Sequence, residues 1–206
     1  MAEKSQRTCA EDVQIPQVMI APVPPAELAA FKRRLGAAFD AATRAQVPGF
    51  AGGAVPEAYV DGALASPGAE ALDFVLDGRG GRGGRGVGVA VGGGNSQPVG
   101  GAVVSGDDDR RELEFLFVDA GLQGRHLGTA AWRALEARYP RTRVWTLVTP
   151  YRERRNINFY VNVCGFAIVE YINSHHASPD YPAENAADFP GGDEGLFRFE
   201  KVMPAR

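Results

Sequence analysis

The chain has 206 residues, of which 45% are apolar and 23% are charged, and its formal net charge is −3. A chain of this length and composition is most simply one globular domain with a substantial buried core. The negative charge argues against wholesale nucleic-acid binding, and two cysteines, Cys9 and Cys164, make neither a disulfide framework nor a metal site. No apolar run approaches membrane-spanning length and the N-terminus lacks a signal-peptide core, so we expect a cytoplasmic protein with no membrane partner.

The N-terminal part of the chain predicts a tail, a strand and two helices. Residues 1–14 are polar and aperiodic, so they are interpreted as a flexible tail before a single domain over residues 15–206. Residues 17–23 predict a strand that ends at Pro24-Pro25. An amphipathic helix follows, because Leu28, Phe31, Leu35 and Phe39 recur at three- and four-residue spacing. A second, shorter helix is expected over residues 56–64.

A Gly/Arg-rich insert at residues 78–97 separates two expected strands, 71–76 and 99–104. RGG repeats occur in disordered RNA-binding segments, but this run is short and lacks aromatic residues. A flexible hairpin connection is therefore favoured over RNA binding.

The C-terminal half alternates strands and helices and then reaches a long loop at residues 173–195, which is rich in proline and acidic residues. A structureless loop of this length is usually functional or disordered. The expected elements are strand 111–118, helix 128–138, strand 144–148, helix 152–163, and strands 166–171 and 197–202.

A compact polar motif, QGRHLGT at residues 123–129, connects strand 111–118 to the helix that follows. Such a turn aims backbone N–H groups and the positive end of a helix at one point, which favours an anion such as a pyrophosphate. The motif fits neither the G-x-G-x-x-G dinucleotide fingerprint nor the phosphate-loop pattern.

The motif resembles that of the GNAT acetyltransferase superfamily, whose signature at this place is Gln/Arg-x-x-Gly-x-Gly/Ala. Gln123, Leu127, Gly128 and Thr129 fit this pattern, and His126 replaces the central glycine. Two later pairs, Phe159-Tyr160 and Gly165-Phe166, also resemble the family, with one extra residue between them compared with the commonest spacing. The element order of residues 17–203 is similar as well.

The resemblance implies a fold and a cosubstrate. The fold is an α/β domain with a mixed, mostly antiparallel sheet of about six or seven strands and helices on both faces. Strands 112–118 and 144–148 should be parallel neighbours that splay apart at their C-terminal ends. The cosubstrate is acetyl-CoA, and the residues implied to bind it are Phe117, Val118, Gln123, Gly124, Arg125, His126, Leu127, Gly128, Thr129 and Asn156.

The resemblance also assigns catalytic roles. Tyr160 matches the tyrosine that protonates the leaving thiolate, the alternative being a tyrosine packed in the core. Glu112 and Glu114 alternate with Leu113, Phe115 and Phe117, so strand periodicity predicts the carboxylates on one face and the apolar residues on the other. Glu114 is the better candidate base, and a structural salt bridge is the alternative for both carboxylates.

These observations favour an N-acetyltransferase that transfers the acetyl group of acetyl-CoA to an amine of a small molecule or a peptide, with a homodimer left open. A catalytically weakened module that binds CoA or a regulatory ligand is the alternative. His175-His176 has no third ligand at a suitable spacing, so a polar turn is favoured there and no metal is expected.

Overall fold

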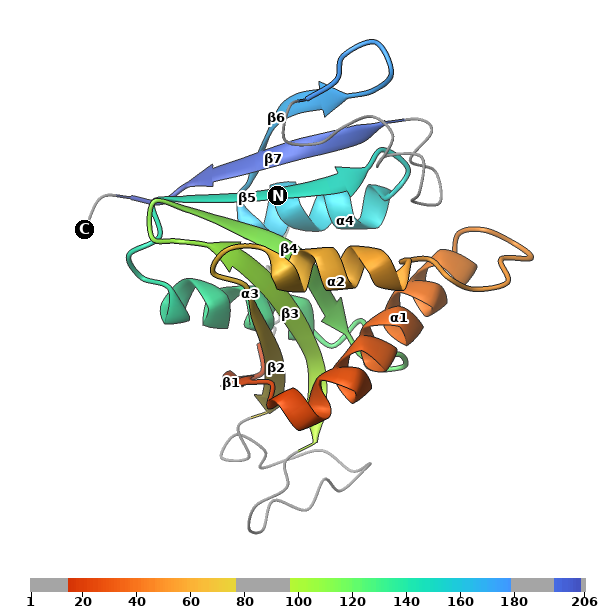
Figure 1. The fold of residues 1–206 in the computed structure, drawn as a ribbon, viewed down its shortest axis with the longest axis vertical. Coiled ribbons are helices and arrows are strands. Elements are labelled where there is room, and N and C mark those ends of the chain that lie inside the picture. The colour runs from red at the N-terminus through yellow and green to blue at the C-terminus, as the bar shows by residue number, and fades with distance from the viewer. Residues whose placement is uncertain (1–14, 77–96, 179–194, 205–206) are drawn as a thin grey trace, which may run out of the picture.

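The structure, a computed structural model, describes residues 15–76, 97–178 and 195–204. One seven-stranded sheet runs through the molecule in the order β1-β2-β3-β4-β5-β7-β6 (Figure 1). The strands are β1 Val18–Pro22, β2 Glu70–Leu76, β3 Pro98–Gly106, β4 Arg110–Val118, β5 Val144–Pro150, β6 Ala167–Ile172 and β7 Leu196–Val202. The helical elements are η1 Pro25–Glu27, α1 Leu28–Arg44, α2 Glu57–Ala65, α3 Leu127–Arg138, α4 Arg154–Asn158 and η2 Phe159–Cys164.

Five of the six strand pairings are antiparallel, and β4 with β5 is the parallel pair. The predicted mixed sheet, with its central parallel pair, is therefore confirmed. The parallel pairing follows from the crossover through α3, which carries the chain from the end of β4 back to the start of β5.

Helices cover both faces of the sheet, as predicted, and two apolar clusters hold them there (Figure 1). On one face, the stripe of Phe31, Leu35 and Ala38 on α1 packs with α2 against β3 and β4. On the other face, α3 and η2 bury Trp132 and Leu135 among the side chains of β1 to β5 and β7. Burial of these stripes is what makes marginal helices of this length stable.

The two central strands are paired only at their beginnings. Their register covers Arg110 to Glu112 on β4 and Val144 to Thr146 on β5, and no pairing follows among the described residues of these two strands. Beyond this point β4 stays paired with β3 as far as Val118, while β5 stays paired with β7 as far as Pro150. The sheet therefore opens into two halves at its centre, which confirms the predicted splay.

A β-bulge at Glu114 accompanies this opening. Consecutive residues of β3, Val103 and Val104, pair with Phe115 and Leu113, so Glu114 is the extra residue on β4. A bulge bends its strand and increases its twist, which directs the end of β4 away from β5.

The bulge also overturns the predicted alternation of faces. Leu113 packs on the α3 face, whereas Phe115 and Phe117 pack on the face of α1 and α2. Glu112 pairs with Ser105, whose hydroxyl binds Glu114, so both carboxylates lie on the α1/α2 face as expected. The prediction that the aromatic residues face away from them was wrong, because an extra residue shifts the two-residue period by one.

The helix predicted over residues 152–163 divides into two parts. α4 is a short α-helix, and η2 is a π-helical turn that ends at Gly165, whose φ is 78°. A π-turn accommodates one residue more than an α-turn. This explains the extra residue between Tyr160 and Gly165 that the sequence shows against the commonest family spacing.

Three predicted segments fall largely outside the described residues: the tail at 1–14, the Gly/Arg-rich insert at 78–97 and most of the loop at 173–195. Within the described part of the chain, no helix has the length and apolar character needed to cross a membrane.

Candidate active site

A cavity of about 1370 Å³ occupies the opening between the two halves of the sheet. Its floor comes from β4 and β5, and α1 and α2 form one wall. The turn before α3 lies at one end, and α4 with the start of η2 forms the opposite wall. The splay of β4 from β5 thus creates the cavity, and the helices close its sides.

The turn that leads into α3 presents unsatisfied backbone donors to this cavity. His126 is the N-cap residue, makes no side-chain cap hydrogen bond, and precedes a first helical turn without acidic residues. The first N–H groups of a helix have no partner within the helix, and its dipole makes this end positive. The geometry fits an anionic group such as a diphosphate.

His126 takes a left-handed backbone conformation, with φ at 57° and ψ at 14°. It is the only non-glycine residue with a positive φ in the described ranges. Gly124, two residues earlier, has a φ of 80°. A glycine in place of His126 would adopt this backbone angle without strain. For His126 the same angle costs roughly 1 kcal/mol.

The structure brings most of the predicted cosubstrate residues to this cavity. Gln123 lies near the end of β4, where its Nε2 donates to the Val118 carbonyl at 3.4 Å. Gly128 faces Phe159 so closely that a Cβ there would lie 3.4 Å from the ring. Of the ten residues, nine line the cavity: Phe117, Val118, Gln123, Gly124, His126, Leu127, Gly128, Thr129 and Asn156. Arg125 is exposed on the turn and is not among the lining residues.

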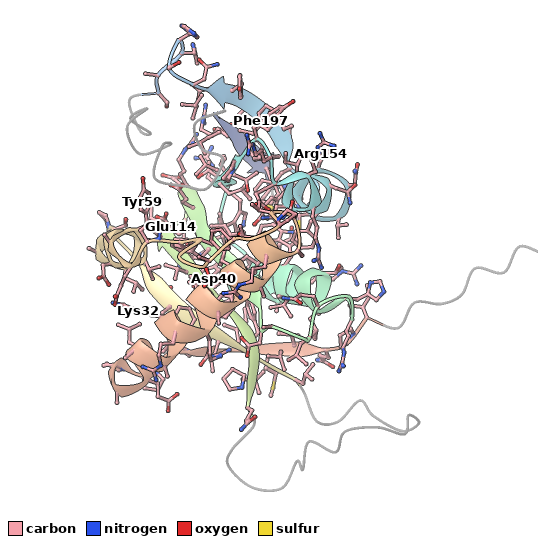
Figure 2. All side chains as sticks on the ribbon, turned by 90° about the vertical axis from the view of Figure 1, so that its right-hand side faces the viewer. Lys32, Asp40, Tyr59, Glu114, Arg154 and Phe197 are labelled. Carbon is pink, nitrogen blue, oxygen red and sulfur yellow. The ribbon has the colours of Figure 1, made fainter. Side chains whose placement is uncertain are left out.

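Glu114 lies on the floor of the cavity, beside α2 and Tyr59 in Figure 2. Its Oε1 accepts a hydrogen bond of 2.7 Å from the Ser105 hydroxyl. Burial, and secondarily the like charge of Glu112, raise the pKa of Glu114 to about 7, although the bond from Ser105 opposes the rise. A carboxylate with this pKa is suited to accept a proton near neutral pH.

Glu112 lines the same cavity two residues earlier, at the last position where β4 and β5 still pair. It is partly buried and opposite Thr146. Its main electrostatic effect in this site is on Glu114, because two carboxylates on one face disfavour each other's ionisation.

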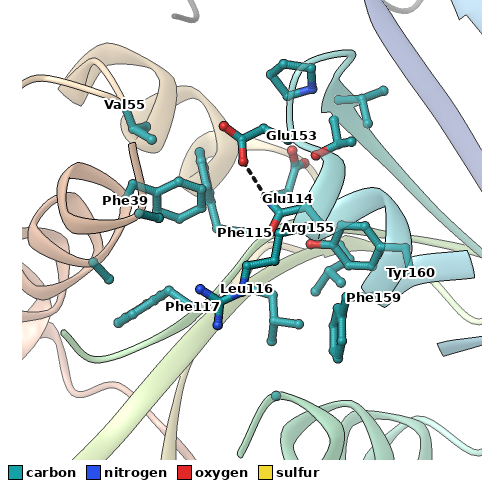
Figure 3. A pocket seen from close by; sticks show the side chains of 18 of the residues that line it. Phe39, Val55, Glu114, Phe115, Leu116, Phe117, Glu153, Arg155, Phe159 and Tyr160 are labelled. Atoms are coloured by element: carbon teal, nitrogen blue, oxygen red, sulfur yellow. Dashed lines mark hydrogen bonds between the residues drawn. The ribbon is translucent and has the colours of Figure 1, made fainter. Parts of the chain in front are cut away.

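Tyr160 is the first buried residue of η2 and is 9% exposed. Its ring packs against Phe159, Phe166 and Phe199, while its hydroxyl points into the cavity (Figure 3). Burial raises the pKa of Tyr160 well above its usual value. The phenol is therefore held protonated, which is the form that can donate a proton.

Glu153 also lines the cavity and lies outside the set of site residues predicted from the sequence. Its Oε2 accepts from the Asn156 Nδ2 at 3.4 Å and from the Gln46 Nε2 at 3.1 Å. The contact with Gln46 joins the segment after α1 to the segment before α4, 107 residues apart in the chain. Nothing in the sequence pairs these two positions, so only the fold could reveal the contact.

His175 and His176 form a polar turn, as favoured from the sequence. Their backbone N–H groups donate to the Asn173 Oδ1 at 2.8 and 2.9 Å, and the His176 ring contacts Glu170 at 3.2 Å. Among residues 15–76, 97–178 and 195–204, no group of three or more potential metal-ligating side chains comes together.

Comparisons with known proteins agree with this geometry. Residues 66–166 match the family model described as Acetyltransferase (GNAT) family. Uncharacterized protein YrkN of Bacillus subtilis (strain 168) is 44% identical over 109 residues, which are 51% of this chain and 59% of YrkN. The chain therefore spans about three fifths of the length of this curated relative.

Two solved structures show the same fold. An acetyltransferase from Thermus thermophilus has a TM-score of 0.55 at 16% identity, over 92% of this chain and 99% of that chain. A Bacillus subtilis acetyltransferase in complex with CoA has a TM-score of 0.53 at 14% identity, over 92% and 99% of the two chains. Residues 66–166 thus match the GNAT acetyltransferase family in sequence, and the fold built around them is the fold of these acetyltransferases.

Proposed function

We propose that the protein is an N-acetyltransferase that uses acetyl-CoA as cosubstrate and a primary amine as acceptor. The observation that carries the proposal is the layout of the cavity. It has uncapped helix N–H groups at one end and, on its floor, a carboxyl whose pKa is about 7. The opening between β4 and β5 connects the two.

The proposed binding mode assigns a role to each end. The diphosphate of CoA would lie against the amides of residues 124–129, where the helix dipole favours negative charge. The pantetheine arm would follow β4 between the strands, with Asn156 nearby. A backbone N–H near Phe117 and Val118 would then bind the thioester oxygen, whose charge grows as the amine attacks.

In the proposed reaction the amine nitrogen attacks the thioester carbonyl carbon directly. Glu114 takes the proton that the acceptor ammonium must lose before attack. The C–N bond forms, the C–S bond breaks, and the Tyr160 hydroxyl donates a proton to the departing thiolate. The attacking nitrogen loses its second proton as the C–S bond breaks, and this proton restores the Tyr160 phenol. Glu114 and Tyr160 both line the cavity, which supports these two roles.

A catalytically weakened module that binds CoA or a regulatory ligand is the second candidate. The observation that favours it is His126, whose β-carbon and imidazole stand at a position where the family pattern has glycine. The backbone amides of the turn are retained in either case.

The test combines a binding measurement with a turnover measurement on the full chain. We expect calorimetry to show acetyl-CoA binding, and a thiol reagent to detect CoA release when a panel of amines is added. Binding without release for every amine would contradict catalysis and favour the weakened module. Absence of both would contradict the whole proposal.

A further inference from the structure

The half of the cavity remote from the α3 turn has one apolar wall. Phe39 of α1 packs edge-on against Phe115 of β4, with ring centroids 5.9 Å apart. Val55 and Tyr59 extend the same wall from the segment before α2 and from α2 itself. The remaining residues of α1 and α2 that line the cavity are mostly small, and they leave its width open: Ala38, Ala42, Thr43, Ala58, Gly62 and Ala63.

The opposite wall and the floor carry carboxylates. Figure 3 shows Phe39 and Val55 on one side, with Glu153 across from them and Glu114 below. The carboxylate of Glu153 is oriented by two neutral amides, from Gln46 and Asn156, and no cation within the described ranges forms an ion pair that neutralises it. Its negative charge is therefore directed into the cavity.

The cationic side chains that line the cavity do not neutralise the Glu153 carboxylate. Arg110 is bound to Glu200 at 3.0 Å, and Arg198 to both Glu170 and Glu200 at 2.6 and 2.7 Å. Arg155 extends towards Leu116 and Phe117, which is the part of the strand assigned above to CoA (Figure 3). Arg154 is exposed at the α4 side (Figure 2).

We infer that the acceptor is a small primary amine on an aromatic or otherwise apolar body that carries no carboxylate, and that Glu153 binds its ammonium group. This inference rests on the proposed function. The ammonium would lie between Glu153 and Glu114, and the apolar body would lie against Phe39 and Phe115. A carboxylate on the acceptor would be repelled by the same two glutamates, since like charges in a partly desolvated site are strongly unfavourable.

Three acceptors separate the effect of a carboxylate on the acceptor from the effect of its apolar ring. The reference is 2-phenylethylamine; phenylalanine adds only a carboxylate to it, and ethylamine lacks the ring. We expect kcat/KM for phenylethylamine to exceed that for each of the other two by about tenfold or more. Glu153→Gln should lower kcat/KM for phenylethylamine by about tenfold, and it should reduce the ratio of kcat/KM for phenylethylamine to kcat/KM for phenylalanine. Phe39→Ala should instead reduce the ratio of kcat/KM for phenylethylamine to kcat/KM for ethylamine, because the ring loses its apolar contact.

Controls exclude a general effect of the substitutions. Glu27→Gln removes an exposed carboxylate at the start of α1 and should leave all three values unchanged. The affinity of Glu153→Gln for CoA should equal that of the wild type, because the amide keeps the shape of the side chain and its carbonyl oxygen can still accept from Gln46 and Asn156.

Binding of phenylethylamine to the CoA-loaded protein, measured by calorimetry, gives a readout that needs no turnover. Glu153-dependent binding without CoA release would retain this inference and contradict the proposed catalysis. Turnover in which phenylalanine equals phenylethylamine, or in which Glu153→Gln changes nothing, would overturn the inference and retain the catalysis.

Discussion

Glu114 illustrates how a β-bulge, one extra residue in a strand, can set the chemistry of a site. The bulge places its carboxyl on the floor of the cavity, partly out of water and near Glu112, and these conditions raise its pKa to about 7. The ordinary value is 4.5, so between pH 4.5 and 7 the folded chain holds a proton that the unfolded chain has lost. Ionisation of Glu114 therefore lowers the free energy of unfolding as pH rises through this window.

We predict that Glu114→Gln lowers kcat/KM by about 100-fold or more and abolishes the rise of kcat/KM with pH near 7, because the base is lost. The same variant should be more stable than the wild type at pH 8 and little changed at pH 4.5, by thermal melting. Glu112→Gln is the matched comparison, since it removes the like charge and should move the rise of kcat/KM to lower pH. An unchanged pH–rate profile in both variants would mean that the base is elsewhere.

Tyr160 combines a buried ring with a hydroxyl directed at the cavity. We predict that Tyr160→Phe lowers kcat by about 100-fold, because only the proton given to the thiolate is lost. The affinity for CoA and the melting temperature should change little, since the phenylalanine ring fills the same space among Phe166 and Phe199. Loss of stability at an unchanged kcat would indicate a packing role instead.

At the scale of the element, the N-terminus of α3 depends on close approach of its backbone to whatever occupies the cavity. A Cβ at Gly128 would already lie 3.4 Å from the Phe159 ring, and further branching would extend towards the proposed diphosphate position. We predict that Gly128→Val weakens CoA binding by about tenfold or more, measured by calorimetry. Gly36→Val is the control, because Gly36 is also helical and a Cβ there meets no atom within 4 Å.

Substitutions at His126 test CoA binding at the turn itself. His126→Gly should relieve the left-handed backbone strain, whereas His126→Ala removes the imidazole and keeps the strain. Tighter CoA binding in both variants would identify the imidazole as an obstruction. Equal affinity in Gly128→Val and the wild type would contradict the placement of the diphosphate.

At the scale of the whole molecule, the site exists because the sheet is continuous at one end and divided at the other. The N-terminal half of the sheet consists of β1 to β4 and is covered by α1 and α2 on one face and by α3 on the other. The C-terminal half consists of β5, β7 and β6. Three paired residues on each central strand join the halves. The cavity therefore collects side chains from α1 to α4, and no single segment contains the site.

The sequence by itself determined the order of the elements and the position of the turn that we propose binds the diphosphate. Local patterns encode these features: the spacing of Phe31 and Leu35 on α1, the prolines before it, and the glycines of residues 123–129. It also placed Glu112, Glu114 and Tyr160 at the cavity, because the two glutamates lie on the strand that leads into the QGRHLGT motif and Tyr160 belongs to a pair that resembles the family.

Only the tertiary structure decided the rest. The bulge arises from pairing with β3, so the strand's own alternation could not predict that Phe115 and Phe117 share a face with the carboxylates. The pKa of Glu114 depends on burial and on Ser105, a residue of another strand. Glu153 acquires its orientation from Gln46, which is distant in the chain. Each of these effects is a contact between segments that the sequence does not pair, and such contacts exist only once the chain has folded.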